Sequence, residues 1–249
     1  MLLKGIGNPS ISKITDGVYA IIDLYHPAEG AGTNAGFIID QGNVVVIDSG
    51  MSVASGQFIW SQILKINDKI DHVTLILTHH HSDHVFGMRV FKEKGAKIIA
   101  HQKIVEPLKI GGRGYKEFIV KQCQITEEQG DEIFGDVRFF EPDKLIQNDL
   151  RLRIGDMILV VLATPGHVVD ELCVYHAQSK TLFAGDTIYE GMPLTTRFGG
   201  INEWKEWIDQ LDRLKQLKID TICPGHGKLC SKEIIDVNIN FLKQKCDGL

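Results

Sequence analysis

Four side chains of types that commonly bind metal ions lie close together in this sequence. His79, His81, Asp83 and His84 belong to the run HHHSDH, which directly follows the apolar segment 73–77. Imidazole and carboxylate groups are typical ligands of Zn²⁺, Fe²⁺ and Mn²⁺. Without a cation, four such groups packed together would repel one another or keep unsatisfied polar atoms. The run therefore predicts a metal site in which His79 and His81 face one ion, and Asp83 and His84 face a neighbouring ion.

Three later turns each carry one further ligand-type residue. His167 lies in TPGH, Asp186 in GDT and His226 in PGHG, and each turn follows an apolar run. Because α/β sheets usually place their sites at the carboxyl ends of strands, the three side chains can converge at one edge of a sheet. A glycine next to each of them lets the backbone approach closely without a Cβ clash. These turns therefore extend the predicted metal site.

Two neighbouring ions would support hydrolysis. Cations about 3.5–4 Å apart need an anionic bridge, and Asp186 suits that role. Metal coordination lowers the pKa of water from about 15.7 to about 7, which would give a bridging hydroxide able to attack an ester, thioester, lactone or amide carbonyl. Asp83, beside the bridge, could orient this nucleophile or pass its proton to the leaving group. We expect zinc in both positions, with iron or manganese as alternatives.

Strands and helices must position these residues. Short apolar, β-branched runs between turn signals predict strands at 18–24, 35–39, 44–47, 73–77, 97–100, 150–154, 157–163, 171–176, 181–184 and 221–223. Helical spacing predicts helices at 52–66, 85–94, 202–217 and 231–245, with Trp204 and Trp207 on the core face of the third. This alternation favours helices packed on a sheet. The polar segment 102–145, with helical character at 123–134, is interpreted as an insertion bordering the site within one domain spanning 1–249.

The order of the motifs resembles that of a known family. Asp48 in VIDSG, the run THHHSDH, the single His167, the GDT turn and the final GHG resemble the motif set of the metallo-β-lactamase superfamily, over about residues 15–230. The resemblance implies an α/β (α+β) fold. Specifically, it implies a four-layer αβ/βα sandwich, in which two mixed β-sheets are flanked by helices and the metals lie at one edge between the sheets.

The resemblance also implies a role for each motif residue. One metal would be held by His79, His81 and His167, and the other by Asp83, His84 and His226. Asp186 would bridge the two metals, and Asp48 would fix the loop that presents the histidines. In lactonases of this superfamily, a tyrosine three residues after the bridging aspartate hydrogen-bonds the substrate. Tyr189 has that spacing, although an aromatic residue at a strand end is the alternative interpretation.

Three other charged or titratable residues border the predicted site. Arg113 and Arg197 lie in glycine-rich loops, where they could hold a substrate carboxylate or remain solvated at the surface. His80 occupies the variable position of the motif and is expected to point away from the metals. We expect the substrate to be selected by the loops 26–34, 107–118 and 188–201.

The ligand set narrows the range of possible activities but does not identify a single one. Asp186 and His84 resemble the glyoxalase II, lactonase and general hydrolase branch, so the prediction is a hydrolase of a small ester, thioester, lactone or amide. Only one helix fits after His226, which argues against glutathione thioester hydrolysis. One alternative is a mononuclear iron oxygenase resembling the persulfide dioxygenases. The other is a metal-binding or partner-binding domain without catalysis.

Composition excludes some partners and compartments. The formal net charge of −5 argues against a general nucleic-acid binder. No apolar run is long enough for a membrane helix, and the N-terminal segment does not read as a signal peptide. The five cysteines are odd in number and lack C-x-x-C spacing, which predicts free thiols and a cytoplasmic protein. The expected partner is a small-molecule substrate, with homo-oligomerisation left open.

Overall fold

Two mixed β-sheets form the centre of the protein in the computed structural model, which describes residues 5–28, 30, 32–111 and 114–248. The seven-stranded sheet contains, in spatial order, β1 (Gly7–Thr15), β2 (Val18–Leu24), β3 (Thr33–Asp40), β4 (Asn43–Ile47), β5 (His72–Ile76), β6 (Lys97–His101) and β7 (Lys144–Ile146). The five-stranded sheet contains β12 (Thr221–Cys223), β11 (Thr181–Phe183), β10 (Leu172–His176), β9 (Met157–Ala163) and β8 (Leu150–Ile154). Pairing is antiparallel from β1 to β4, parallel from β4 to β7, and parallel again between β11 and β12.

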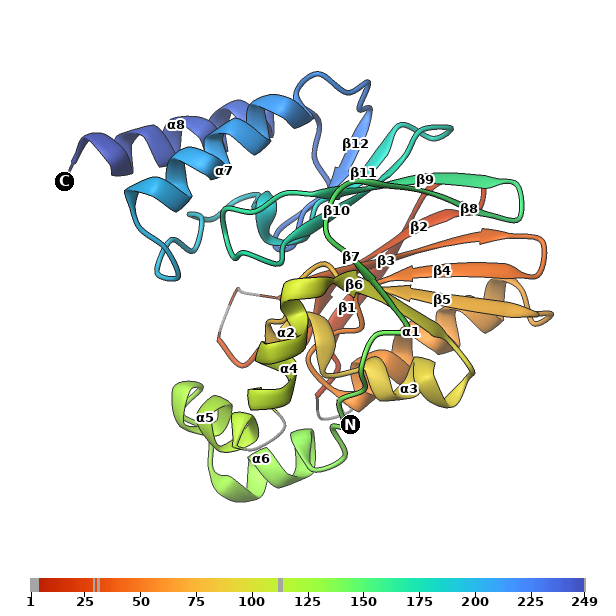
Figure 1. Cartoon of the computed structure of the whole chain (residues 1–249). Coiled ribbons are helices and arrows are strands. Elements are labelled where there is room, and N and C mark those ends of the chain that lie inside the picture. Colours follow the sequence, from red (N-terminus) through yellow and green to blue (C-terminus); the bar gives the residue numbers. More distant parts are fainter. Residues whose placement is uncertain (1–4, 29, 31, 112–113, 249) are drawn as a thin grey trace.

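Helices cover the outer faces of both sheets. α1 (Val53–Ile66) and α3 (Met88–Glu93) pack against the seven-stranded sheet, whereas α7 (Ile201–Leu214) and α8 (Ile234–Asp247) lie beside the five-stranded sheet (Figure 1). The order of layers is therefore helix, sheet, sheet, helix. This arrangement confirms the predicted αβ/βα sandwich.

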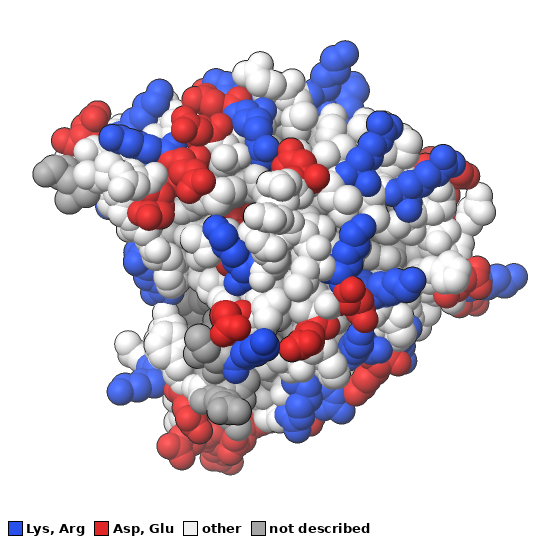
Figure 2. Space-filling model, in the orientation of Figure 1, with Lys and Arg blue, Asp and Glu red and all other residues white. Residues whose placement is uncertain are grey.

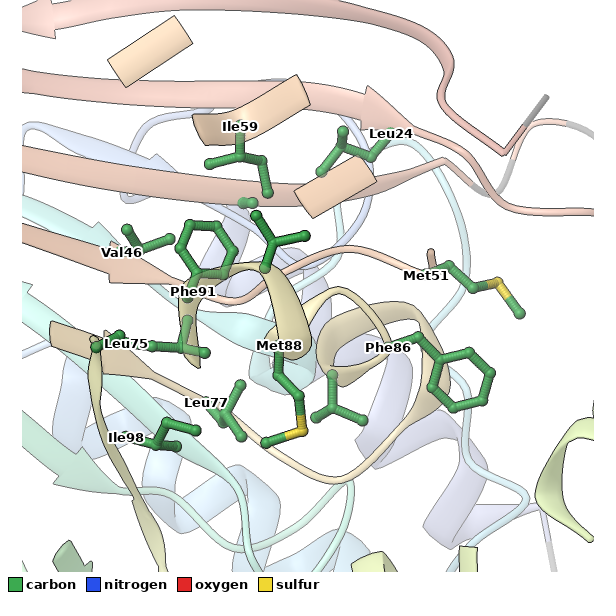
Figure 3. Close-up of a cluster of buried hydrophobic side chains, with 14 of the residues drawn as sticks. Leu24, Val46, Met51, Ile59, Leu75, Leu77, Phe86, Met88, Phe91 and Ile98 are labelled. Carbon is green, nitrogen blue, oxygen red and sulfur yellow. The ribbon is translucent and has the colours of Figure 1, made fainter. Parts of the chain in front are cut away.

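The apolar runs of the central strands are explained by burial on both faces. Along β4, Val44 and Val46 belong to the hydrophobic cluster beneath α1 and α3, whereas Val45 and Ile47 belong to the cluster between the two sheets. Successive side chains of a strand point to opposite faces, so a strand buried on both sides must be apolar throughout. Figure 3 shows the first cluster, whose labelled side chains include Val46 of β4, Ile59 of α1 and Phe91 of α3. A third cluster lies between the five-stranded sheet and the helices α7 and α8.

The structure differs from the prediction in two additional strands and in a break within one predicted helix. β1 and β7 were not predicted, because β1 carries mainly polar or half-exposed residues and β7 has only three residues. The helix expected at 85–94 is divided into α2 (Ser82–Val85) and α3. At the break, a Cβ on Gly87 would lie 2.0 Å from the carbonyl oxygen of Ser49. Only glycine permits this approach, which seats the histidine loop against the turn after β4.

The segment 102–145 is more regular than its composition suggested. It contains η1 (Gln102–Ile104), α4 (Val105–Gly111), α5 (Tyr115–Gln122) and α6 (Glu127–Phe134). Thr126 and Gln129 form a capping box at the start of α6, and Phe134 anchors its end in the cluster beneath α1. In Figure 1, α5 and α6 stand away from both sheets, below the edge at which the two sheets meet. Among the described residues, no helix is both long and apolar enough to cross a lipid bilayer.

Candidate metal centre

The carboxyl ends of strands from both sheets meet at one edge of the sandwich. β9 and β11 both run antiparallel to β10, and β12 runs parallel to β11, so these three strands point in the same direction. They are followed by His167, Asp186 and His226, respectively. In the other sheet, β5 leads into His79 and then into the short helix α2. The topology therefore brings the predicted ligand residues together, as expected from their positions after strands.

The first of two ligand groups contains His79, His81, His167 and Asp186, whose ligand atoms all lie within 4.8 Å of one another. His167 Nε2 lies 3.1 Å from His81 Nδ1 and 3.3 Å from Asp186 Oδ2. His79 Nε2 lies 3.7 Å from the same carboxylate oxygen. Three imidazoles and one carboxylate could hold a tetrahedral zinc ion.

The second group contains Asp83, His84 and His226, again with all ligand atoms within 4.8 Å. Asp83 Oδ2 lies 3.3 Å from His226 Nε2 and 3.5 Å from His84 Nε2. Thr33 Oγ1 donates a hydrogen bond of 2.9 Å to the same oxygen, which holds the carboxylate in place. This group could hold a second divalent ion.

Asp186 lies between the two groups and offers one oxygen to each. Its Oδ2 faces His167 and His79, whereas its Oδ1 lies 3.1 Å from His84 Nε2 and 3.4 Å from His226 Nε2. Gly225 leaves room for the carboxylate in this position. A Cβ at residue 225 would lie only 2.1 Å from Asp186 Oδ1. Asp186 thus faces both groups, which is the arrangement that a bridging role would require.

Several polar atoms at the centre of this cluster lack a protein hydrogen-bond partner. Among the described residues, the buried atoms in this state include Nε2 of His79, His81 and His84, and Oδ1 of Asp186. Buried polar atoms are normally satisfied, because leaving one unpaired costs about 1–3 kcal/mol. Lone pairs on nitrogen and carboxylate oxygen that point at one small volume fit a divalent cation.

The titration behaviour of the cluster shows the same need for positive charge. Burial lowers the pKa of His226, but the carboxylates of Asp186 and Asp83 outweigh burial and raise it to about 10. The pKa of His84 is likewise raised well above 6.5, because Asp186, Asp83 and Asp48 outweigh its burial. Burial raises the pKa of Asp186, yet the surrounding imidazoles hold it well below 3.8. Asp186 therefore carries a negative charge at neutral pH, which favours positive charge on the groups around it.

Asp48 orients the loop that carries the histidines. Its Oδ1 accepts a hydrogen bond of 2.8 Å from the backbone N–H of Thr78. Its Oδ2 accepts from Thr78 Oγ1 and contacts His84 Nδ1, both at 2.8 Å. A hydrogen bond at Nδ1 selects the imidazole tautomer whose Nε2 is free to bind a metal. Asp48 thus connects Thr78, at the start of the histidine loop, with His84 at its end.

Three other imidazoles are oriented in the same way. Nδ1 of His167 lies 3.2 Å from the Thr195 carbonyl, and Nδ1 of His226 lies 3.2 Å from the Gly32 carbonyl. His79 Nδ1 lies 3.4 Å from Glu171 Oε1. In each case Nε2 points towards the carboxylates of the cluster. These contacts fix the direction of each ring before any ion binds.

The other candidate residues occupy different surroundings. Tyr189 is buried, and its hydroxyl donates a hydrogen bond of 2.6 Å to Asp186 Oδ2. His80 lies outside both ligand groups, and its Nδ1 pairs with Asp170 Oδ1 at 2.8 Å. Arg197 lines the cavity beside the site. Arg113 lies outside the described residues.

Two buried carboxyl groups next to the site were not predicted. Asp170 holds His80, and Glu171 Oε1 accepts from the backbone N–H of Asp186 at 3.1 Å. Burial raises the pKa of Glu171 well above 4.5, and Asp186 adds to this effect. The available signal was a pair of acidic residues directly before an apolar strand, three and four residues after His167. Such a pair normally belongs to a solvated turn, so only the fold reveals its burial.

A cavity of about 1470 Å³ opens onto the cluster. Asp83, His167, Asp186 and His226 lie in its wall, so both ligand groups are reached from it. Residues of the loops 26–34, 107–118 and 188–201 also line it, as do Ile119 and Gln122 of α5. The three loops expected to select the substrate therefore border the cavity.

Comparisons with known proteins agree with this geometry. A hydroxyacylglutathione hydrolase of Bartonella tribocorum is 27% identical over 116 residues, which are 47% of this chain and 34% of that enzyme. An acyl-coenzyme A thioesterase of Bos taurus, MBLAC2, is 22% identical over 229 residues, which are 86% of this chain and 79% of that enzyme. The chain therefore spans about one third of the first relative and most of the second.

A solved structure shares the fold. The metallo-β-lactamase from Pontibacter korlensis superposes with a TM-score of 0.73 at 19% identity, covering 95% of this chain and 99% of that one. The sequence profile of the metallo-β-lactamase superfamily matches residues 28–226, which include both ligand groups. The chain belongs to the metallo-β-lactamase superfamily.

Proposed function

We propose that the protein is a hydrolase that holds two divalent metal ions, with zinc as the expected metal, and cleaves an ester, thioester, lactone or amide. The observation that carries this proposal is Asp186, which offers one carboxylate oxygen to each of two histidine-containing groups. A mononuclear site would leave the Asp83, His84 and His226 group without a cation. His79, His81 and His167 would hold one ion, and the second group would hold the other.

Ions bound there would supply a water molecule whose pKa is lowered to about 7 and would polarise the substrate carbonyl. The chain's own groups would do the rest. Asp83 lines the cavity with its carboxylate fixed by Thr33, so it is placed to orient water and to pass a proton to the leaving group. The Tyr189 hydroxyl donates a hydrogen bond to Asp186 and lines the same wall of the cavity, where it would donate to substrate only by giving up the bond to Asp186.

Thioesters are the first substrates to test. The two relatives described above act, by their names, on hydroxyacylglutathione and on acyl-coenzyme A, and both are thioesters. All five cysteines are free and none forms a disulfide, which supports a reducing compartment such as the cytoplasm.

The test combines metal analysis with a hydrolysis screen on the purified protein. We expect two divalent ions per chain and hydrolysis of at least one ester, thioester, lactone or amide. Asp186→Ala should reduce both metal occupancy and turnover at least about a hundredfold, because it removes the bridge and leaves a buried cluster of imidazoles. Asp156→Ala, in an exposed turn, is the matched control.

Three results would refute the proposal. If Asp186→Ala alters neither metal content nor turnover, the site has been placed wrongly. A single iron per chain with oxygen uptake on a persulfide would identify an oxygenase. Full metal loading without turnover on the whole panel would identify a metal-binding domain without catalysis.

A further inference from the structure

Glu171 lies where loops from the two sheets meet. Its backbone carbonyl accepts a hydrogen bond of 2.9 Å from the N–H of Thr164, the first residue of the TPGH turn. The N–H of the next residue, Leu172, donates a hydrogen bond of 2.8 Å to the carbonyl of Thr78, which directly precedes His79. Two loops that supply residues of the first ligand group are therefore bound to the backbone at this position.

The side chain of Glu171 connects two members of that group. Its Oε1 accepts a hydrogen bond of 3.1 Å from the backbone N–H of Asp186 and lies 3.4 Å from Nδ1 of His79. His79 follows β5 of the seven-stranded sheet, whereas Asp186 follows β11 of the five-stranded sheet. A single oxygen thus contacts one ligand residue from each sheet.

His79 has a second acceptor beside the same ring nitrogen. Thr78 Oγ1 lies 3.1 Å from His79 Nδ1 and donates its own proton to Asp48 Oδ2 at 2.8 Å. Two acceptors beside Nδ1 place the ring proton on that nitrogen, which leaves Nε2 available for a metal. Because Thr78 can hold this tautomer by itself, the separate contribution of Glu171 is the spacing between His79 and Asp186.

The burial of Glu171 is unfavourable for stability, which indicates another role. Acidic side chains normally lie at the surface, as on the face shown in Figure 2, where they are interspersed with Lys and Arg. Glu171 is only 1% exposed, and its Oε2 has no hydrogen-bond partner among the described residues. An apolar side chain of similar length would avoid this unpaired oxygen. Side chains that oppose stability in this way are typical of functional sites.

We infer that Glu171 is a positioning residue for the ion of the first ligand group. Its Oε1 holds His79 and the turn of Asp186 at their observed spacing, and Glu171 itself lies outside both ligand groups. Because both contacts are to the first group, loss of Glu171 should weaken that ion more than the ion of the second group. This inference rests on the proposed two-metal function and adds a residue which that proposal does not use.

The test compares Glu171→Met with Glu171→Gln in the full-length protein. Gln keeps an oxygen in place of Oε1 and puts an amide nitrogen where Oε2 already lacks a partner, whereas Met keeps the length and removes both oxygens. We expect Glu171→Met to weaken Zn²⁺ binding at the first group about 10–100-fold, and Glu171→Gln to bind within about threefold of the wild type. Glu141→Met, at an exposed position, is the matched control.

The two ions are measured separately by competition against chelators of graded affinity. His226→Ala interrupts the second group and therefore reports the first, whereas His167→Ala interrupts the first group and reports the second. The loss of affinity caused by Glu171→Met should be larger in the His226→Ala background. In that background, the absorption spectrum of bound Co²⁺ should change in Glu171→Met and return to the reference spectrum in Glu171→Gln.

Thermal unfolding of the metal-free proteins separates positioning from a general structural role. Glu171→Met leaves the Asp186 N–H without its acceptor but also removes the unpaired Oε2, so the two effects oppose each other. We expect the Tm of the metal-free variant to lie within about 4 °C of the wild type, the shift that about one hydrogen bond causes in a domain of this size. A larger fall in Tm with equal loss of both ions would show a structural role and overturn the inference.

The outcomes also distinguish this inference from the proposed function. Unchanged affinity for both ions in Glu171→Met, or a loss that Glu171→Gln does not restore, would overturn the inference even if the protein binds two ions and hydrolyses its substrate. The proposed function would fail separately if Glu171→Met weakened the first ion selectively but the wild type cleaved no ester, thioester, lactone or amide.

Discussion

The substitution Asp48→Asn tests how the histidine loop is held. The carboxylate of Asp48 accepts from the backbone and the hydroxyl of Thr78 and contacts His84 Nδ1, all at 2.8 Å. An amide has one oxygen and one NH₂ group in the same space. If the NH₂ group faces the Thr78 backbone, two donors oppose each other. If it faces His84, Nδ1 must accept and the proton moves to Nε2, the atom that would bind the metal.

Either orientation carries a similar cost. An unpaired buried donor costs about 1–3 kcal/mol. Replacing the partner of a metal-binding imidazole typically weakens metal affinity about 10–100-fold, which corresponds to about 1.4–2.8 kcal/mol. The two values agree, so we expect Asp48→Asn to weaken the ion at Asp83, His84 and His226 by about 10–100-fold. The ion at His79, His81 and His167 should be weakened less, because Asp48 contacts none of these side chains directly.

The assay is competition for Zn²⁺ against chelators of graded affinity, with the metal content measured after equilibration. Asp40→Asn, at the end of β3, is the control for the same chemical change at a half-exposed position. Thermal unfolding of metal-free wild type and variant separates a loss of stability from a loss of affinity. Equal weakening of both ions, or unchanged affinity at both, would contradict the proposed role of the Asp48–His84 contact.

Three further predictions follow from single contacts. Tyr189→Phe should keep both metals and lower kcat/KM about 10- to 150-fold, since a hydrogen bond to a charged group contributes about 1.5–3 kcal/mol. Metal analysis and steady-state kinetics check this. Gly225→Ala should lower metal affinity at least about tenfold, because its Cβ would lie 2.1 Å from Asp186 Oδ1; chelator competition measures it. The N–H of Ile98 lowers the pKa of Asp143 below 3.8, outweighing partial burial. The Asp143 carboxylate therefore stabilises the fold above pH 3.8, and this stabilisation is lost as the pH falls through the lowered pKa. Asp143→Ala should lower the free energy of unfolding by about 1 kcal/mol at pH 7 and by progressively less below pH 3.8. Denaturant titrations at several pH values measure this difference.

The sequence predicted the ligand groups because their position depends on local rules. The ligand residues lie in the short loops that follow apolar runs, and the ends of strands that run in one direction meet at one edge of a sheet. His167, Asp186 and His226 are far from His79 in sequence, yet the end of a strand is enough to place each of them. The role of Gly225, directly before His226, could also be interpreted from the sequence. A residue without a Cβ is needed there, because the backbone passes close to Asp186.

Contacts that depend on tertiary packing could not be predicted in this way. Glu171 is polar and follows a turn, so its sequence surroundings favour exposure, whereas the fold buries it against the backbone of Asp186. β1 lacks a continuous apolar run, because it lies at the sheet edge with alternate residues exposed. α5, at 115–122, has weak apolar periodicity and was not predicted, whereas α6, at 127–134, lies within the segment 123–134 that was expected to be helical and begins at a capping box.

The ligand groups follow from local sequence patterns, whereas contacts in the cavity wall depend on tertiary packing. The ligand groups lie at strand ends, which change little when loops are replaced, so the proposed metal chemistry does not depend on the loops that line the cavity. With its amide oriented so that the oxygen faces the guanidinium, Gln122 of α5 contacts Arg197, and no local pattern predicts a contact between these two separated segments. Because both residues line the cavity, Gln122→Ala should loosen Arg197 and alter the KM for substrate without altering metal content. A change in metal content would instead show that α5 supports the ligand groups, and would separate the role of the segment 102–145 in stability from its role in recognition.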